Sequence, residues 1–157
     1  MPMTKMMKKT VVAIAAMLNI VATPAIVHAD TNESAPTNPN AAMSGLLTVG
    51  DLNACYVLST TNVKCWGYNN SGQLGIGSTS NIGDGTGEMA SLAAVDLGTG
   101  ETAISLTAGG SSNCAVLQDS AVKCWGFNSS GQLGIGNTTN VGTTSGQMGN
   151  SLQEVPL

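Results

Sequence analysis

Four cysteines are the residues of this chain whose types and spacing point most directly to chemistry. They form two pairs with the same spacing, Cys55 with Cys65 and Cys114 with Cys124. An even number of cysteines is typical of disulfides in an exported protein, whereas a zinc site built from all four would use short C-x-x-C spacings that are missing here. We therefore predict the disulfides Cys55–Cys65 and Cys114–Cys124 and no metal.

Carboxylates are the remaining candidates for catalysis, because His28 is the one histidine and falls in a segment that we expect to be removed on export. Without an imidazole, the mature chain has no Ser-His or Cys-His catalysis and no histidine-bound metal. A polysaccharide lyase or glycosidase would need paired carboxylates. The candidates are Asp51, Asp84, Glu88 and Asp119. None of them recurs at a matching position of the repeat described below, so we predict that the protein is not an enzyme and keep the carboxylate-dependent enzyme as the alternative.

Residues 1–29 have the features of a signal peptide. Three lysines precede the apolar run "VVAIAAMLNIVA", and Ala29 ends a small-residue motif that suits cleavage. The run is too short to span a bilayer, which takes about 20 residues. Cleavage after Ala29 would leave two lysines against nine acidic residues, a net charge of −7. We therefore predict a secreted, periplasmic or cell-surface protein without a membrane anchor, whose acidic surface disfavours nucleic acid.

The rest of the chain is a linker followed by an internal repeat. Residues 30–44 are polar, rich in Pro and Asn and without periodicity, which predicts a disordered linker. The segment "VKCWGYNNSGQLGIG" begins at Val63, and "VKCWGFNSSGQLGIG" begins 59 residues later, at Val122. Repeats of this length, with short apolar runs between Gly-rich turns, are typical of β-sheet propellers and solenoids. We divide the folded part into repeats 45–100 and 101–157.

The positions that both copies share are typical of packing and turns. Trp66 and Trp125 would each fill the space between sheets, although either could instead stack on a sugar or a base. The glycine-rich turns lack the following helix and the spacing of a phosphate-binding loop, so no cofactor is expected. The predicted structural core of the repeat consists of Trp66, Gly67, Gly72, Gln73, Leu74, Gly75, Gly77 and their counterparts Trp125, Gly126, Gly131, Gln132, Leu133, Gly134 and Gly136.

The segments that differ between the copies carry the candidates for binding. Asp84 and Glu88 in "GDGTGE" resemble a calcium loop, but the second copy reads "GTTSGQ" and lacks both carboxylates. A calcium site in the first copy therefore stays open. The candidates for contact with a protein or a cell-surface glycan are residues 69–71, 78–88, 128–130 and 137–147.

The cysteine spacing also predicts a hairpin in each copy. With Cys114 opposite Cys124, residues 118–120 form the loop. Directly opposed residues of a non-hydrogen-bonded pair lie about 4.5 Å apart by Cα, which suits a disulfide. Closing a loop of this length should add about 3 kcal/mol in the chain-entropy model.

The segment "AGGSSNCAVLQDSAVKCWGFNSSGQLGIGNTTNVG" resembles the repeat of the regulator of chromosome condensation family, in the disulfide-bearing version of secreted bacterial proteins. The resemblance covers both copies and implies that each is about one four-stranded blade of a β-propeller. Ser120 departs from the family pattern because it follows Asp119 where glycine is usual, and the first copy has Thr60 and Thr61 there. We expect these turns to be strained or rearranged.

The predicted fold is therefore all-β: an incomplete β-propeller of two tandem blades after a signal-peptide helix and a linker. Two blades cannot close a ring, so an apolar sheet face should stay exposed at each outer side. Three interpretations remain: a truncated gene remnant, an oligomer in which three or four chains complete a ring, or a surface module that stays partly open.

The resemblance implies guanine-nucleotide exchange and chromatin docking for the family's eukaryotic namesake, and neither fits an acidic exported chain. Secreted bacterial relatives resemble protein-binding propellers, including inhibitors of β-lactamases, and that class fits better. We predict a non-enzymatic exported repeat protein that binds a protein or a cell-surface ligand.

Overall fold

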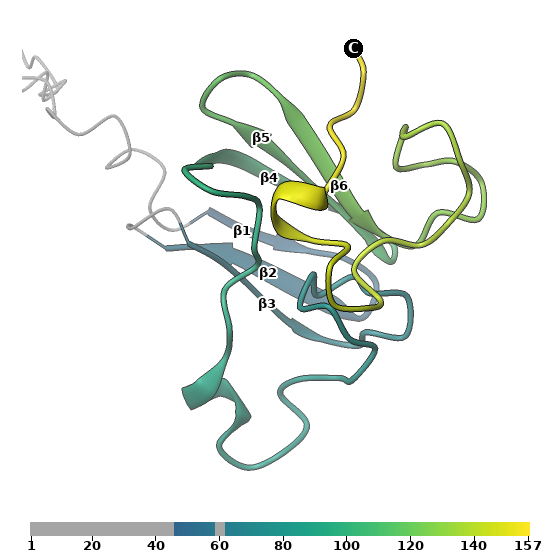
Figure 1. Cartoon of the computed structure of the whole chain (residues 1–157). Helices are drawn as coiled ribbons and strands as arrows, with labels where there is room; N and C mark the ends of the chain where they lie inside the picture. Colours follow the sequence, from purple (N-terminus) through teal and green to yellow (C-terminus); the bar gives the residue numbers. More distant parts are fainter. Residues whose placement is uncertain (1–45, 59–61) are drawn as a thin grey trace, which may run out of the picture. The chain divides into compact units, whose positions relative to one another are not determined.

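The structure is a computed structural model that describes residues 46–58 and 62–157. The predicted signal peptide with its cleavage site at Ala29 and the linker 30–44 lie outside these residues. The described part is all-β and contains two three-stranded antiparallel sheets (Figure 1). The first sheet contains β1 (Leu46–Val49), β2 (Asn53–Val57) and β3 (Val63–Gly67). The second contains β4 (Ala103–Gly109), β5 (Ser112–Leu117) and β6 (Val122–Gly126). We call each sheet, with the segment that follows it, blade 1 and blade 2.

Burial in the central strands alternates with a period of two. In β2 and β5 every second residue is buried, as expected when successive side chains point to opposite faces of a sheet. The helical segments of the described part are two short 3-10 turns, η2 (Glu88–Ser91) and η3 (Gly149–Ser151). No helix within residues 46–58 and 62–157 is long and apolar enough to cross a membrane. The all-β prediction is confirmed.

A fourth segment runs beside the last strand of each sheet without forming a regular strand. The Val95 N–H donates to Val63 O and the Val155 N–H donates to Val122 O, both at 2.8 Å. In blade 1 this segment is also hydrogen-bonded to blade 2, because Asp96 O accepts a hydrogen bond from the Gly149 N–H at 2.8 Å. In blade 2 it contains a proline, which has no N–H to donate. Each expected four-stranded blade is therefore three strands with a fourth extended segment.

Long loops leave β3 and β6 and return to the same sheet. Gly67 and Ile82 exchange two backbone hydrogen bonds of 2.7 and 3.1 Å. Gly126 and Val141 do the same at 2.8 and 3.1 Å. These paired bonds close the base of each loop, which is teal for blade 1 and yellow-green for blade 2 in Figure 1. The two loops are therefore held to their sheets at equivalent positions of the repeat.

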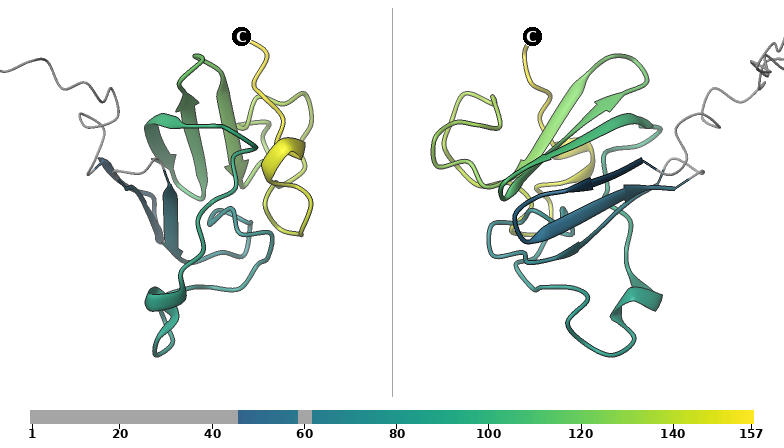
Figure 2. Two further views of the ribbon diagram at one scale, coloured as in Figure 1. Left: turned by 60° about the vertical axis from the view of Figure 1, so that its left-hand side comes forward. Right: turned by 180° about the vertical axis from the view of Figure 1, so that it is seen from behind.

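The hydrophobic core lies between the two sheets, which both views of Figure 2 show packed against each other. One cluster of buried residues joins them, including Val57, Val63 and Leu74 from blade 1 and Leu117 and Trp125 from blade 2. Neither sheet could bury this apolar area alone, because a single small sheet has no second layer to cover its face. The two blades thus share this main core, and a second, smaller cluster of Cys124, Leu133 and Ile135 belongs to blade 2.

The β5–β6 hairpin has the predicted register, with Cys114 opposite Cys124. At its turn, the Leu117 N–H donates to Ala121 O at 2.8 Å and the Ser120 N–H donates to Leu117 O at 2.9 Å. Ser120 has a φ of 75° and is the one non-glycine residue with positive φ among the described residues. The predicted strain is therefore found at Ser120. The equivalent turn with Thr60 and Thr61 lies outside the described residues.

Replacing Ser120 with glycine should stabilise the protein by about 0.5–1 kcal/mol. The left-handed conformation costs a non-glycine residue about 1–2 kcal/mol, and the larger entropy that glycine loses on folding offsets part of the gain. Chemical denaturation with intact disulfides measures the difference. Ser129→Gly is the matched control, because Ser129 is exposed and has no positive φ; it should be slightly less stable than the parent. A loss of stability in Ser120→Gly would contradict the prediction.

Candidate functional site

Both predicted disulfides are present. Cys55 is bonded to Cys65 and Cys114 to Cys124, with Cα atoms 4.1 Å apart in each pair. Each bond joins directly opposed residues of two neighbouring strands. Cys55 and Cys65 are 0% exposed and Cys124 is 4% exposed, whereas Cys114 is partly exposed. The two bridges are therefore alike in covalent geometry and differ in how well the rest of the protein covers them.

Each sheet has two faces, which we name after the cystine and the tryptophan that they carry. The disulfide face of blade 1 carries Cys55, Val57, Val63 and Cys65, and that of blade 2 carries Cys114, Val116, Val122 and Cys124. The tryptophan face of blade 1 carries Leu47, Val49, Ala54, Tyr56, Lys64 and Trp66. The tryptophan face of blade 2 carries Leu106, Ala108, Asn113, Ala115, Lys123 and Trp125.

The disulfide face of blade 1 packs against the tryptophan face of blade 2. Trp125 is fully buried, and its Nε1–H donates to Gln73 O at 3.1 Å. The side chain of Asn113 donates to the same oxygen at 2.7 Å. Trp125 is thus a packing residue with its one polar atom satisfied, and a sugar or a base has no access to it.

The glycines of "GQLGIG" in blade 1 let the two blades approach closely. A Cβ on Gly72 would lie 2.5 Å from the carbonyl carbon of Gly142, and one on Gly75 would lie 2.9 Å from Nε1 of Trp125. Both glycines also have positive φ. Contact between backbones and tight turning therefore account for this glycine-rich segment.

Gln73 and Gln132 bind neighbouring backbone in both copies of the repeat. Oε1 of Gln73 accepts a hydrogen bond from the Ser71 N–H at 2.9 Å, and Oε1 of Gln132 accepts one from the Ser130 N–H at 2.9 Å. Gln73 is nevertheless buried under blade 2, whereas Gln132 is exposed. The same local turn is thus covered in one copy and open in the other.

Asn69 holds the loop of blade 1 together from within. Its Nδ2 donates to Ser78 O at 2.8 Å and to Ser80 O at 2.9 Å, and its Oδ1 accepts from the Leu74 N–H at 2.9 Å. Asn128 makes the equivalent bonds in blade 2. Both side chains are 0% exposed. The prediction that these two asparagines contact a ligand is wrong, because their amides are engaged in closing the loops.

Lys123 is a buried cation whose role the sequence analysis missed. It is 4% exposed, and its Nζ donates to Leu97 O at 2.8 Å and to Oε1 of Glu101 at 3.3 Å. Leu97 and Glu101 lie where the chain passes from blade 1 to blade 2. Lys123 therefore holds this connection against the tryptophan face of blade 2. The sequence did contain a signal for its burial. In "VKCW" the lysine precedes the tryptophan by two residues, and side chains two residues apart in a strand lie on the same face of the sheet.

Glu88 organises its loop through backbone donors. Its Oε2 accepts hydrogen bonds from the Gly83 N–H at 2.7 Å and the Gly85 N–H at 2.8 Å. These bonds, the one from Gly85 first, lower the pKa of the Glu88 carboxyl. In blade 2, Oε1 of Gln147 takes the same place and accepts from the N–H groups of residues 142–144. A neutral amide thus performs the same structural role as this carboxylate.

The loop of blade 1 should consequently loosen in acid. A carboxyl whose folded pKa lies below its ordinary value of 4.5 contributes stability that is present above that value and is lost as the pH falls through the folded pKa. Amide hydrogen exchange, corrected for the intrinsic rate, should show that Gly83 and Gly85 lose protection below about pH 4. The amides of Gly142 and Thr143, which Gln147 holds, are the internal control and should stay protected. Equal loss in both loops would contradict the prediction.

The four candidate carboxylates do not converge on one site. Asp84 and Glu88 share a loop of blade 1, Asp51 lies in the β1–β2 turn, and Asp119 lies in the β5–β6 turn. Oδ1 of Asp119 accepts a hydrogen bond from the Ala121 N–H at 3.0 Å. Across residues 46–58 and 62–157, no three histidine, cysteine or acidic side chains are grouped so that they could hold a metal ion. This arrangement adds no support to the carboxylate-dependent enzyme or to a calcium site.

The tryptophan face of blade 1 is the best candidate for a binding surface. Leu47 is 57% exposed and Val49 is 64% exposed, whereas Leu106, the counterpart of Leu47, is 7% exposed. Trp66 is partly exposed, whereas Trp125 is buried. The exposed Leu52 and Met89 add to the apolar surface of blade 1. Exposed apolar side chains gathered on one blade are typical of an interaction site.

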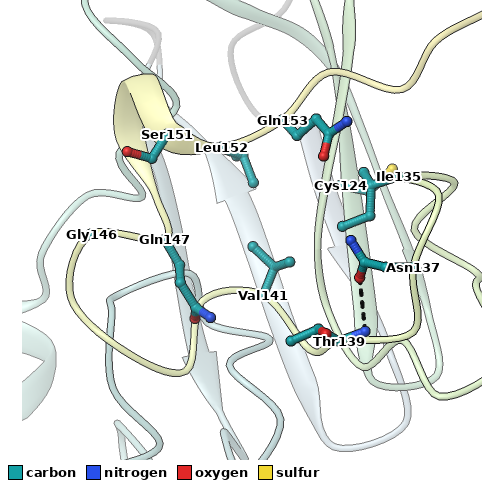
Figure 3. A pocket seen from close by; sticks show the side chains of 10 residues that line it. All are labelled: Cys124, Ile135, Asn137, Thr139, Val141, Gly146, Gln147, Ser151, Leu152 and Gln153. Carbon is teal, nitrogen blue, oxygen red and sulfur yellow. Dashed lines mark hydrogen bonds between the residues drawn. The ribbon is translucent and has the colours of Figure 1, made fainter.

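The disulfide face of blade 2 is the second candidate surface. Cys124 is buried there in a small cluster with Leu133 and Ile135, and a cavity of about 350 Å³ lies beside this cluster. Figure 3 shows Cys124 and Ile135 together on one side of this cavity and Gln147 on the other side. Val141 and Leu152 lie between the two sides. The dashed line is the hydrogen bond from the Thr139 N–H to Oδ1 of Asn137, 2.9 Å long. The remaining lining residues are Gly146, Ser151 and Gln153.

Known proteins resemble this chain through the repeat. The family model of the regulator of chromosome condensation (RCC1) repeat matches residues 103–132. The chain is 37% identical over 81 residues to the human X-linked retinitis pigmentosa GTPase regulator, a match that covers 51% of this chain and 7% of the relative. The dog protein of the same name is 37% identical over 88 residues, which covers 54% and 8%. The chain thus spans less than a tenth of these curated relatives.

Solved structures with a similar backbone include human WBSCR16, with 22% identity and a TM-score of 0.49 over 62% of this chain and 23% of that chain. Yeast RCC1 (Prp20), solved with bound Kap60, has 19% identity and a TM-score of 0.49 over 71% and 24%. Prp20p from Saccharomyces cerevisiae, described with its binding to Gsp1p and histones, has 22% identity and a TM-score of 0.49 over 71% and 25%. Residues 103–132 therefore match an RCC1 repeat, and the chain is similar through this repeat to the curated relatives.

Proposed function

We propose that this chain is a non-enzymatic, exported repeat protein that binds another protein through the tryptophan face of blade 1. One observation carries the proposal: this face exposes Leu47 and Val49 to solvent, although the same face one repeat later is a buried interface. Leaving a Leu or Val side chain in water forgoes about 1.5–3 kcal/mol of burial. A partner that covers the face would gain that free energy.

The loop beside the face supports the same function. In blade 2, residues 142–148 pack on blade 1, since Gly142 lies against Gly72 and Met148 lies near Gly75. In blade 1 the matching residues 83–87 are exposed. The two copies differ most in these loops, so a partner could be recognised by loop side chains around an apolar centre. The curated relatives are, by name, regulators of a GTPase, which are proteins that act on other proteins.

Export is supported by the two disulfides and by the composition of residues 1–29. Disulfides persist in oxidising compartments and are rare in the cytosol. We propose a bacterial origin on the resemblance stated above. N-terminal sequencing of the protein recovered from the periplasm or the medium tests export, and the expected first residue is Asp30. A full-length chain with four free thiols in the cytosol would contradict this part of the proposal.

Photo-crosslinking in the producing cells tests the binding surface. A photoreactive amino acid at Leu47 or Val49 should give adducts of discrete mass, which mass spectrometry then identifies. The same amino acid at Gln118, which is exposed in the β5–β6 turn, is the matched control and should give none. Adducts of equal yield at all three positions, or none at any of them, would contradict binding through this face.

A further inference from the structure

We infer that the partner of the tryptophan face of blade 1 is the disulfide face of blade 2 in a second copy of this chain, so that copies associate head to tail. The inference rests on the proposed function, since it names the partner of the same surface. The contact between blade 1 and blade 2 within one chain shows which groups such an association would bring together.

Three features hold the contact within the chain. Trp125 Nε1–H donates to Gln73 O at 3.1 Å. Lys123 Nζ donates to Leu97 O at 2.8 Å. Gly72 allows an approach at which a Cβ would be 2.5 Å from the backbone of blade 2. The fit thus depends on an N–H donor and a cation from blade 2 and on the absence of a side chain at Gly72 of blade 1.

The same groups occur a second time with less cover. On the tryptophan face of blade 1, Trp66 and Lys64 match Trp125 and Lys123, and both are partly exposed. On the side of blade 2, Gln132 matches Gln73 and is exposed, and Leu157 matches Leu97 and is 99% exposed. A Cβ on Gly131, the counterpart of Gly72, would meet nothing within 4 Å.

These counterparts pair as donors with acceptors. Trp66 Nε1 would donate to Gln132 O of the second copy, as Trp125 does to Gln73 O. Lys64 would donate to the backbone oxygen of Leu157, as Lys123 does to that of Leu97. Each copy thus has one side of the contact on blade 1 and the complementary side on blade 2.

The cavity of Figure 3 lies where the second copy would dock. In blade 1, Cys65, Ile76 and Ile82 pack into the core that also contains Trp125. Their counterparts Cys124, Ile135 and Val141 line the cavity, and Val141 also packs against the shared core. On blade 1 these side chains are covered by blade 2, whereas on blade 2 they form a smaller cluster with Leu133 that borders the cavity.

Side-chain sizes change in opposite directions on the two open faces. The tryptophan face of blade 1 has Val49 and Tyr56 where blade 2 has two alanines. The disulfide face of blade 2 has Ser105 where blade 1 has Leu46. Larger side chains on one surface and a smaller one on the other keep the total volume closer to that of the internal contact.

Two differences make the association weaker than the internal contact. Ala54 replaces Asn113, so one hydrogen bond to the glutamine carbonyl is lost. Like charges on an acidic chain also oppose self-association. We therefore expect a reversible association that strengthens as salt screens this repulsion.

Light scattering of the mature, oxidised protein between about 5 and 500 µM tests the inference. The weight-average mass should rise at least twofold over this range and rise further in high salt. Val49→Asp, on the tryptophan face of blade 1, and Val116→Asp, on the disulfide face of blade 2, should each remain monomeric. Gln118→Asp adds the same charge in an exposed turn and should associate like the parent. Circular dichroism confirms that each variant is folded.

Mixing the two monomeric variants separates this arrangement from others. Val49→Asp keeps an intact disulfide face and Val116→Asp keeps an intact tryptophan face, so their mixture should form a dimer and stop there. A heterologous contact behaves in this way, whereas a symmetric contact between identical faces does not. A parent that stays monomeric, or a mixture that stays monomeric while the parent associates, would overturn the inference. If the parent is monomeric but crosslinks from Leu47 or Val49 reach a different protein, the proposed function stands and this inference fails.

Discussion

Replacing Trp125 with alanine is expected to lower the free energy of unfolding by about 4 kcal/mol, whereas the same replacement at Trp66 should cost about 1–2 kcal/mol. Both residues occupy the same position of the repeat and the same place in their sheets. Trp125 is 0% exposed in the shared core, and Trp66 is partly exposed on the open face. Truncation of a buried tryptophan removes its transfer free energy and leaves a cavity between the sheets.

The lost hydrogen bond adds to the cost at Trp125. Its Nε1–H and the side chain of Asn113 share the oxygen of Gln73, so this oxygen keeps one donor after the replacement. Trp125→Phe retains most of the volume and removes the donor, and it should cost about 1–2 kcal/mol. It also keeps the prediction testable if Trp125→Ala does not fold.

Denaturation by urea with intact disulfides measures these differences. The protein concentration should stay low, because association through the tryptophan face would stabilise the parent and raise the apparent cost at Trp66. Equal losses at the two tryptophans would contradict the assignment of one face as covered and the other as open.

The sequence could not distinguish these two tryptophans. "VKCWG" is identical in the two copies, and local patterns decide the strand, its register and the face on which a side chain lies. Burial of that face depends on which layer packs against it, which is a property of the neighbouring blade. The disulfides, in contrast, were predictable, because they depend on register within one hairpin, and that follows from the spacing of two cysteines.

Polar residues inside the fold were the least predictable part of the site. Asn69 and Asn128 lie in loops without periodicity, and their burial follows from bonds to carbonyls nine and eleven residues away. Lys123 is buried because one backbone oxygen and one carboxylate meet its ammonium group. Such residues look like surface residues in a sequence, since their solvation is replaced by partners that only the folded chain brings together.

Removing the buried disulfide should have the second large effect. Cys55→Ala with Cys65→Ala is expected to lower the free energy of unfolding by about 4 kcal/mol, and Cys114→Ala with Cys124→Ala by about 3 kcal/mol. Both bridges close loops of equal length, with a sequence separation of 10. The chain-entropy contribution of about 3 kcal/mol is therefore the same for both, and the difference reflects the burial of the one cysteine, Cys114, that is partly exposed.

The order of reduction in the native protein follows from the same difference in burial. Cys114 is partly exposed, so a small dithiol can attack its bridge while the blades stay packed. Cys55 and Cys65 are 0% exposed, so their bridge should react only after the blades separate. Alkylation followed by mass spectrometry should find Cys114 and Cys124 labelled first at low protein concentration. At high concentration a docked second copy should slow that step and leave the slower one unchanged. Equal rates for both bridges at low concentration would show that opening of the whole domain controls reduction, and would contradict the view that Cys114 gives a dithiol access to the second bridge.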